Sequence, residues 1–337
     1  MKTLLVTLDF PPLLGGISNY YYNRVKKIPA GQVVVLMNRV QGFEDVKFKN
    51  IYFKKFFIKY FWPHWVLLFW HVWRTVKKEG IEKVWIGQVL PVGTVVYFLS
   101  KILKFKYFVT CHGNDLLRAK KNKRKFKLVK NILDNAEFIE ANTEFTKNVL
   151  TKDFGTKEER IKIIYPESVL NRKTADEKMI ESIKSKYSLF NNKILLTVAR
   201  LVESKGIDQI IKALDIVNDK NIKYLIIGDG QYRSALKKAI PSLLLRDNVI
   251  FIGSVAHQEL PNYYALADAF ILTPRKNSAG DTESFGVVYL EAKEFGLPII
   301  ASDVGGIKEA LKNYNNFTLV DSENINQIAD NIIKVLA

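Results

Sequence analysis

The apolar residues of the chain gather in short runs, separated by longer stretches in which apolar and polar residues mix. Runs that are apolar almost throughout are typical of parallel strands buried on both faces. The pattern predicts strands at 2–8, 32–37, 83–87, 107–111, 136–141 and 161–164 in the first half, and at 193–199, 223–227, 249–255, 269–273 and 299–302 in the second.

The mixed stretches predict helices, among them 18–27, the latter part of 47–78, 92–103, 232–240 and 260–267. Strands and helices alternate in both halves. This predicts an α/β protein with two doubly wound, Rossmann-like domains that face each other across a cleft.

A polar and charged stretch divides the two halves. We therefore place an N-terminal domain at 1–165, a linker region at 166–190 and a C-terminal domain at 191–337. The apolar run at the N-terminus is too short for a signal peptide and reads as a buried first strand. No apolar run approaches the ~20 residues needed to span a bilayer. With the single cysteine Cys111, a disulfide framework and a cysteine-based zinc site are excluded.

The positive charge is unevenly distributed. Residues 1–165 hold 30 Lys and Arg against 13 Asp and Glu, whereas residues 166–337 hold 21 of each, so the first half carries the whole net charge of +17. This asymmetry favours a polyanionic partner for the first half. A general bias towards lysine is the alternative, but it does not explain why the second half is neutral.

The basic residues cluster in 117–133, which has many Lys and Arg and no acid. Such a cluster docks proteins on anionic lipid, at about 1 kcal/mol per basic residue. A solvated helix face and a nucleic-acid partner are alternatives. With no recognised nucleic-acid motif, we favour a membrane surface and expect a cytoplasmic protein, peripheral on the inner face of the cell membrane. The predicted membrane patch is Arg118, Lys120, Lys121, Lys123, Arg124, Lys125 and Lys127.

Segment 47–78 interleaves aromatic residues and lysines. Two interpretations stay open for its helical part. It is either an amphipathic helix lying in the plane of a membrane, or a core helix with buried aromatic side chains.

Two carboxylates, Glu283 and Glu291, stand eight residues apart in 281–306. We expect Ser284, Phe285, Gly286 and Val287 to open a helix, so that their backbone N–H groups form an anion site. Eight helical residues rise about 12 Å, which suits a ligand with hydroxyls at both ends and a diphosphate between, as in a nucleotide-sugar. Two surface glutamates on an ordinary amphipathic helix are the alternative.

Other candidates follow predicted strands. A glycine pair, Gly15 and Gly16, follows the first strand, and His112 follows the strand at 107–111, where open α/β sheets bind ligands. The cations Arg200 and Lys205 flank a strand-to-helix turn and suit a diphosphate leaving group. Each alone also fits a structural or solvated role. A complete G-x-G-x-x-G dinucleotide motif is absent.

Taken in order, these motifs resemble the family 4 retaining glycosyltransferases of the GT-B fold. Within that family the chain is most similar to bacterial phosphatidylinositol mannosyltransferases and related lipid hexosyltransferases. The likeness spans nearly all 337 residues. The residues that carry it are Asp9-Phe10-Pro11-Pro12, Gly15-Gly16-Ile17, His112-Gly113-x-Asp115, Arg200 and Lys205, Gly228-Asp229-Gly230, Phe251-x-Gly253-x-Val255, Tyr264-x-x-Ala267-Asp268, Pro274-Arg275, Gly280-Asp281, Glu283 to Glu291, and Gly305-Gly306.

The resemblance implies a role for each candidate residue. As catalytic residues it implies His112 near the reacting sugar carbon, Glu283 on the donor sugar, and Arg200 and Lys205 on the diphosphate. For donor binding it adds Glu291 on the ribose. The remaining donor-binding positions are Gly15, Gly16, Gly228, the backbone of Val255 at the base, and the amides of Ser284, Phe285, Gly286 and Val287. Asp9 and Asp115 are acceptor-side candidates.

The resemblance also implies a reaction. A hexose moves with retention from a nucleotide-diphosphate sugar, GDP-mannose favoured and a UDP-hexose possible, to a hydroxyl of a membrane-associated lipid. No metal or other cofactor is expected. A soluble or polysaccharide acceptor is the alternative within the class, and a non-catalytic nucleotide-sugar-binding protein is the alternative outside it.

The chain departs from the family pattern in two places. At the domain junction it has Pro166-Glu167-Ser168 where Asn-Gly commonly follows the proline. It also ends at Ala337, where family members usually continue into a helix returning to the first domain, so we expect that helix to be short, missing or trimmed.

Overall fold

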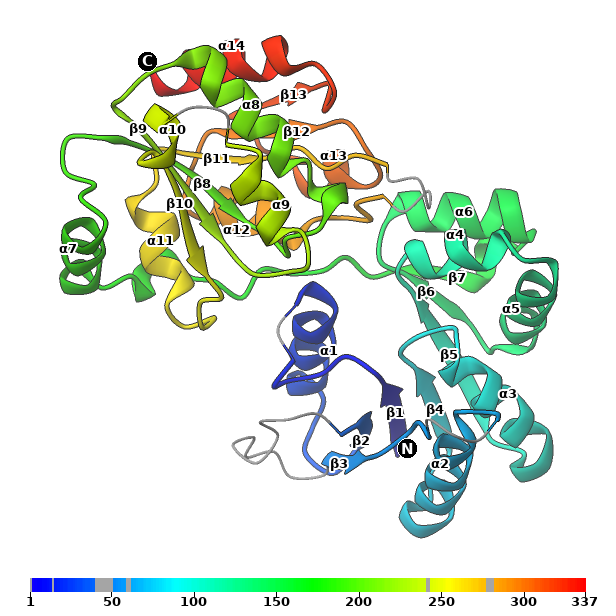
Figure 1. The fold of residues 1–337 in the computed structure, drawn as a ribbon. Helices are drawn as coiled ribbons and strands as arrows, with labels where there is room; N and C mark the ends of the chain where they lie inside the picture. The colour runs from blue at the N-terminus through cyan, green and yellow to red at the C-terminus, as the bar shows by residue number, and fades with distance from the viewer. Residues whose placement is uncertain (1, 14, 40–50, 59–61, 241–242, 277–281) are drawn as a thin grey trace. The chain divides into compact units, whose positions relative to one another are not determined.

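The computed structural model describes residues 2–13, 15–39, 51–58, 62–240, 243–276 and 282–337. The chain forms two compact units, Met1–Glu167 and Ser168–Ala337 (Figure 1). The division falls within the segment that we interpreted as a linker. Most of that segment folds with the second unit, because Leu170, Ile183 and Leu189 are buried in its core.

Unit 1 contains a seven-stranded parallel sheet in the order β3-β2-β1-β4-β5-β6-β7. The order reverses between β1 and β4, since β1 is followed by β2 on one side while β4 continues on the other. The strands are β1 (Thr3–Thr7), β2 (Val33–Asn38), β3 (Ile51–Lys54), β4 (Lys83–Ile86), β5 (Lys106–Cys111), β6 (Ile139–Ala141) and β7 (Ile161–Ile163).

Helices cover both faces of this sheet. In β1, Leu4 and Val6 pack into one core while Leu5 packs into another, as the alternation of side chains along a strand requires. The first core is covered by α2 (Val66–Glu79), α3 (Val92–Leu103), α4 (Asn114–Lys120), α5 (Lys123–Asn135) and α6 (Glu144–Phe154), and the second by α1 (Gly16–Lys26).

Helix α2 decides part of the question left open for segment 47–78. Its Leu68, Val72 and Val76 are buried in the core of unit 1, so one face is a core face. Trp70 on its other face is 49% exposed, and Trp62, which precedes the helix, is 82% exposed. Residues 47–50 and 59–61 of this segment lie outside the described residues.

Unit 2 contains a six-stranded parallel sheet in the order β10-β9-β8-β11-β12-β13, with the order reversing between β8 and β11. The strands are β8 (Lys193–Val198), β9 (Ile222–Ile227), β10 (Val249–Gly253), β11 (Ala269–Leu272), β12 (Ile299–Ser302) and β13 (Phe317–Val320).

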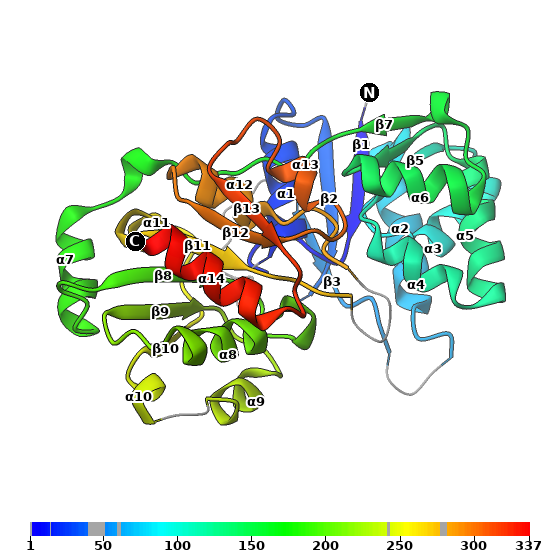
Figure 2. The same ribbon diagram turned by 90° about the horizontal axis from the view of Figure 1, so that it is seen from above.

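The helices of unit 2 include two long amphipathic ones, α8 and α14, which pack side by side (Figures 1 and 2). They are α7 (Glu177–Lys186), α8 (Ile207–Val217), α9 (Arg233–Lys238), α10 (Leu243–Arg246), α11 (Leu260–Leu266), α12 (Val287–Glu294), α13 (Ile307–Ala310) and α14 (Ile325–Leu336).

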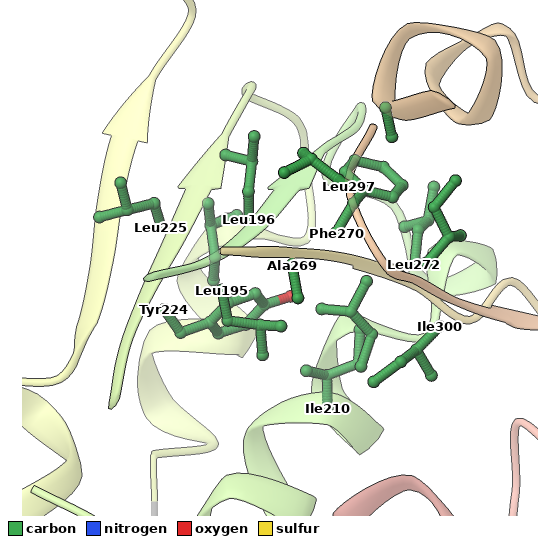
Figure 3. Packing of buried hydrophobic residues seen from close by; sticks show 14 of the residues in the cluster. Leu195, Leu196, Ile210, Tyr224, Leu225, Ala269, Phe270, Leu272, Leu297 and Ile300 are labelled. Atoms are coloured by element: carbon green, nitrogen blue, oxygen red, sulfur yellow. The ribbon is translucent and has the colours of Figure 1, made fainter. Parts of the chain in front are cut away.

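The core of unit 2 lies around the central strands β8, β9 and β11. Figure 3 shows Leu195, Tyr224 and Ala269 from these strands together with Ile210 of α8, all fully buried. Strands this apolar on both faces match the continuous runs in the sequence. The two units together confirm the predicted class of two doubly wound α/β domains.

Among the described residues, no helix is both long and apolar enough to cross a membrane.

Candidate functional site

In each sheet, the point where the strand order reverses lies between two strands whose carboxyl ends leave room for a ligand. In unit 2 these strands are β8 and β11, so the loops after Val198 and Leu272 flank the point. In unit 1 they are β1 and β4, so the loops after Thr7 and Ile86 do so. The predicted site residues sit largely in these loops.

The first relationship in unit 2 joins Lys205 to Glu283. The Lys205 ammonium forms an ion pair with Oε2 of Glu283, and the two side chains are only 21% and 16% exposed. The structure thus brings together two residues predicted for the diphosphate and the sugar. An ammonium and a carboxylate held at a sheet switch point can exchange partners with a ligand that carries phosphate and hydroxyl groups.

Glycines hold both partners in place. Gly206 follows Lys205 with a left-handed φ of 68°, and a Cβ there would lie 2.0 Å from the carbonyl oxygen of Thr273. Gly305 has a φ of 60°, and its Cβ would lie 1.7 Å from the carbonyl oxygen of Glu283. That same carbonyl accepts a hydrogen bond from the Gly306 N–H at 3.1 Å. Only glycine allows these close backbone approaches.

Arg275 also supports the turn after β8 that carries Lys205. No role was predicted for it from the sequence. Its guanidinium contacts Asp208 at 3.2 Å, Glu203 at 3.5 Å and Glu323 at 3.7 Å. Its backbone N–H donates to the carbonyl of Ser204 at 2.9 Å. Arg275 therefore fixes the turn that carries Lys205. The sequence signal that could have identified Arg275 is its position just after β11, a strand that ends at the switch point.

The helix that we expected to begin at Ser284 begins at Val287 instead. Gly286 is its N-cap with a left-handed φ of 81°, which a right-handed helix excludes, and Ser284 and Phe285 precede it. The expected 12 Å helical rise from Glu283 to Glu291 was therefore wrong, because the first part of that interval is loop. The first-turn N–H groups that can face an anion are therefore those of α12 from Val287 onward.

Glu291 lies in the second turn of α12 and is only 4% exposed. Its Oε2 accepts a hydrogen bond from the hydroxyl of Tyr264 at 2.7 Å. Burial raises the pKa of this carboxyl to about 7, and the Tyr264 hydrogen bond opposes that rise. Glu291 is thus not an exposed residue on an amphipathic helix. Tyr264 is a further site residue that sequence reasoning missed, although it stands in one of the quoted motifs.

The other donor-site candidates of unit 2 follow neighbouring strands. Arg200 lies exposed in the loop after β8. Gly228 follows β9, and a Cβ there would lie 1.9 Å from the carbonyl oxygen of Ala199. Val255 follows β10 and packs half-buried against the core. All three stand at the carboxyl edge of the sheet. Gly280 and Asp281, which carry part of the resemblance, lie outside the described residues.

In unit 1, Asp9 and the glycine pair flank the switch point. Oδ2 of Asp9 accepts a hydrogen bond at 3.0 Å from the side-chain amide of Gln88, which follows β4. Gly16 is the first residue of α1, and Gly15 is its N-cap, with no side chain capping the helix. The first-turn N–H groups of α1 are thus available at the edge where β1 ends.

His112 comes directly after β5, and its ring is buried against α1. Its Nε2 lies 2.7 Å from the hydroxyl of Tyr21. Burial lowers the pKa of His112 to about 4, so the ring is neutral at pH 7. The backbone N–H of His112 donates a hydrogen bond to Oδ1 of Asp115 at 3.2 Å. Burial raises the pKa of Asp115 to about 6. The structure therefore joins the predicted pair through the backbone of the turn.

The predicted membrane patch lies on α4, α5 and the turn between them, and all seven residues are exposed. The opposite face of α5 is buried through Val129, Ile132 and Leu133. Lys120 forms an ion pair with Asp153 at 2.6 Å. The segment is therefore an amphipathic helix pair with a basic outer face.

Across the part of the chain that the structure describes, no three His, Cys, Asp or Glu side chains gather in a metal-binding arrangement.

Comparison with known proteins places this geometry in a family. The model of "Glycosyltransferase Family 4" matches residues 14–166, and that of "Glycosyl transferases group 1" matches residues 179–337. A GDP-mannose-dependent alpha-(1-6)-phosphatidylinositol monomannoside mannosyltransferase of Mycobacterium tuberculosis is 26% identical, over 99% of this chain and 89% of that protein. An alpha-monoglucosyldiacylglycerol synthase of Streptococcus pneumoniae is 26% identical over 66% of this chain and 49% of its own length.

Solved structures give the same answer for the fold. Anabaena HepE in complex with UDP and glucose matches with a TM-score of 0.82 at 20% identity, over 99% of this chain and 89% of that one. WaaG, a glycosyltransferase involved in lipopolysaccharide biosynthesis, matches with a TM-score of 0.72 at 17% identity, over 99% and 90%. Two doubly wound units of this kind define the GT-B class of glycosyltransferase.

Within that class, the chain belongs to the family 4 glycosyltransferases. It is an enzyme that transfers a hexose, as the resemblance implied.

Proposed function

We propose that this chain is a retaining glycosyltransferase that moves a hexose from a nucleotide-diphosphate sugar to a hydroxyl of a membrane-associated lipid. GDP-mannose is the favoured donor and a UDP-hexose the second candidate. The observation that carries the proposal is the constellation of unit 2: Lys205 paired with Glu283, the N-terminus of α12, and buried Glu291.

Each part of this constellation suits one part of the donor. Lys205 and exposed Arg200 supply positive charge for the diphosphate, and the N–H groups at the start of α12 supply donors to its oxygens. Buried Glu291 accepts hydrogen bonds from the ribose hydroxyls. Glu283 exchanges Lys205 for hydroxyls of the hexose when the diphosphate takes the ammonium.

The proposed reaction forms one bond at the anomeric carbon and breaks another there. The acceptor hydroxyl oxygen forms a bond to the anomeric carbon on the face from which the diphosphate departs, and the bond from that carbon to the diphosphate oxygen breaks. The hydroxyl proton passes to the leaving phosphate oxygen. Lys205 and Arg200 stabilise the negative charge that develops there. We propose that these cations serve in place of a metal ion.

The lipid acceptor is supported by the relatives and by unit 1. The mycobacterial relative is named for a phosphatidylinositol monomannoside and the streptococcal relative for a diacylglycerol lipid. The exposed basic face of α4 and α5 fits an anionic lipid surface. Exposed Trp62 and Trp70 suit the interfacial region of a bilayer. We propose that the protein binds peripherally to the inner face of the cell membrane through unit 1.

A donor panel tests the proposal. Thermal shifts are recorded with GDP, UDP, GDP-mannose and UDP-glucose, since a ligand bound only by the folded state raises Tm. Transfer is then assayed to vesicles containing phosphatidylinositol or diacylglycerol. We expect GDP-mannose to give the largest shift and a mannosylated lipid. No shift and no transfer with any donor contradicts the proposal.

Two further measurements test the finer parts. NMR of the product gives its anomeric configuration, and an α-linked product from an α-linked donor is the result expected for retention. EDTA should leave the rate unchanged. An inverted product, or a rate lost in EDTA and restored by Mg²⁺ or Mn²⁺, contradicts the corresponding part.

A further inference from the structure

Three segments of unit 1 meet at the hydroxyl of Tyr21, on the buried face of α1. Oη of Tyr21 contacts the carbonyl oxygen of Gly87, directly after β4, and lies 2.7 Å from Nε2 of His112, directly after β5. The rings of Tyr20 and Tyr21 both meet the imidazole edge-on, with centroids 5.5 Å away. The imidazole is thereby held between two aromatic side chains of one helix.

The direction of these hydrogen bonds follows from the number of protons available. A backbone carbonyl has no proton to give, so the single hydroxyl proton of Tyr21 lies on its bond to Gly87. Oη therefore presents a lone pair to His112, and the proton of the second bond belongs to Nε2. Burial lowers the pKa of His112 to about 4, against a hydrogen bond to the Gly87 backbone that raises it, so the ring carries one proton only at pH 7. That proton is on Nε2, and Nδ1 is left with a lone pair.

We infer that Tyr21 is a positioning residue that holds His112 as the Nε2–H tautomer and so makes Nδ1 a hydrogen-bond acceptor for a ligand hydroxyl at the carboxyl edge of the unit 1 sheet. The inference rests on the proposed function in one respect, that His112 takes part in hexose transfer. With the opposite tautomer, Nδ1 would carry the proton and could only donate a hydrogen bond to a ligand oxygen. Tyr21 thus acts on the reaction through His112.

NMR of protein labelled with ¹⁵N-histidine tests the tautomer directly, because protonated and unprotonated ring nitrogens have well-separated shifts. The chain has four histidines, and the spectrum of a His112→Gln variant identifies the His112 signals. We expect His112 to be Nε2–H at pH 7.5. Tyr21→Phe should give a mixture of both tautomers, and kcat for transfer should fall about tenfold while KM for the donor stays within twofold, as for one lost hydrogen bond.

Tyr20→Phe is the matched control. Tyr20 stands on the same helix and touches the same ring, but its hydroxyl accepts a hydrogen bond from Arg24. This variant should keep both the Nε2–H tautomer and kcat. An equal loss of kcat in the two variants, with the tautomer unchanged in both, overturns the inference in favour of a structural role.

The measurement on the unmodified protein depends on neither tyrosine variant. A proton on Nδ1 there overturns the inference outright. A changed tautomer in Tyr21→Phe with full transfer activity also overturns it, since the positioning would then have no effect on the reaction. Failure of the proposed function is distinct: no donor would be turned over, while His112 would still show the Nε2–H tautomer.

Discussion

Lys205 and Glu283 are separated by 78 residues in the sequence, yet their side chains form an ion pair at the switch point of the unit 2 sheet. The two residues come from the loops after β8 and before α12. Because parallel strands β8 and β11 are neighbours, their following loops meet at one edge. Both charges are therefore presented where the fold places its ligands.

Replacement of Lys205 by Met should remove the charge that faces the donor diphosphate. We expect kcat/KM to fall about 10²–10³-fold, as for loss of a group that stabilises developing charge. Lys308 is the matched control, because it pairs with Asp303 at 2.6 Å but is 61% exposed. Lys308→Met should keep kcat/KM within twofold. Equal activity of both variants would remove Lys205 from the site.

Glu283→Gln tests the exchange of partners at the same position. The Glu283 carboxylate forms an ion pair with the Lys205 ammonium, so it competes with a donor phosphate for that ammonium. The neutral amide should relieve this competition, so we expect GDP or UDP to bind at least as tightly as to the unmodified protein. Transfer of the hexose should fall, because the sugar loses its carboxylate. Calorimetric titration and a transfer assay separate the two effects, and weaker binding of the diphosphate argues against the exchange.

The buried carboxyl of Glu291 makes stability depend on pH. Its pKa is about 7 in the folded protein against an ordinary value of 4.5. Between these values the folded chain binds a proton that the unfolded chain releases, so the free energy of unfolding falls as pH rises from about 4.5 to 7. Glu291→Gln lacks this contribution. The Tm of the variant relative to the unmodified protein should therefore be higher at pH 8 than at pH 5.

Donor binding should depend on the same titration. An ionised Glu291 accepts hydrogen bonds from ribose hydroxyls better than a protonated one. We expect donor affinity to rise between pH 6 and 8 in the unmodified protein and to stay constant in Glu291→Gln, as measured by calorimetric titration. An identical pH profile in both proteins would show that Glu291 does not bind the ribose.

The sequence was sufficient for the fold because its signals are local. Apolar runs such as 193–199 and 299–302 identify β8 and β12 within a residue or so, and alternation with helices determines the doubly wound class. The start of α12 was misplaced because Ser284 and Phe285 are compatible with a helix. The left-handed conformation of Gly286, where a Cβ would lie 2.5 Å from the ring of Tyr289, ends the loop and starts the helix at Val287.

The candidate site was predicted less completely, for a different reason. Motif order supplied Lys205, Glu283 and Glu291, but the residues that hold them were not found. Tyr264 of α11 reaches Glu291 of α12. Tyr21 of α1 reaches His112, which follows β5. A buried tyrosine looks like an ordinary core residue in the sequence, because the partner of its hydroxyl is set by tertiary contacts alone.

The basic outer face of α5 and of the turn before it should control binding to anionic membranes. We expect replacement of Lys121, Lys123, Lys125 and Lys127 by Gln to weaken binding to phosphatidylserine-containing vesicles at least 100-fold, at about 1 kcal/mol per charge. Gln preserves helix propensity. The control replaces four exposed lysines of unit 2 in the same way. These are Lys212, Lys220, Lys237 and Lys238. Equal co-sedimentation of both variants would mean that total charge, and not this face, governs binding.

A buried ion pair attaches α1 to the sheet of unit 1. Nη2 of Arg24 donates to Oε1 of Glu140 at 2.8 Å, and the guanidinium lies 4.4 Å from the ring centroid of Trp85. The hydroxyl of Thr110 also donates to Glu140 at 2.7 Å. The Glu140 side chain is 5% exposed, so loss of Arg24 would leave a buried carboxylate without its counter-charge.

Arg24→Met should therefore lower the free energy of unfolding of unit 1 by about 3–5 kcal/mol. The double variant Arg24→Met/Glu140→Met should lose less than the single variant, because no unpaired charge stays buried. Lys27→Met is the control: its pair with Glu167 is more than half exposed on both sides and should change stability by less than about 1 kcal/mol.

Tryptophan fluorescence during urea unfolding follows unit 1 selectively, because all five tryptophans of the chain lie in it. A double variant as unstable as Arg24→Met would show that packing of the Arg24 side chain on Trp85, and not its charge, holds α1 to the sheet.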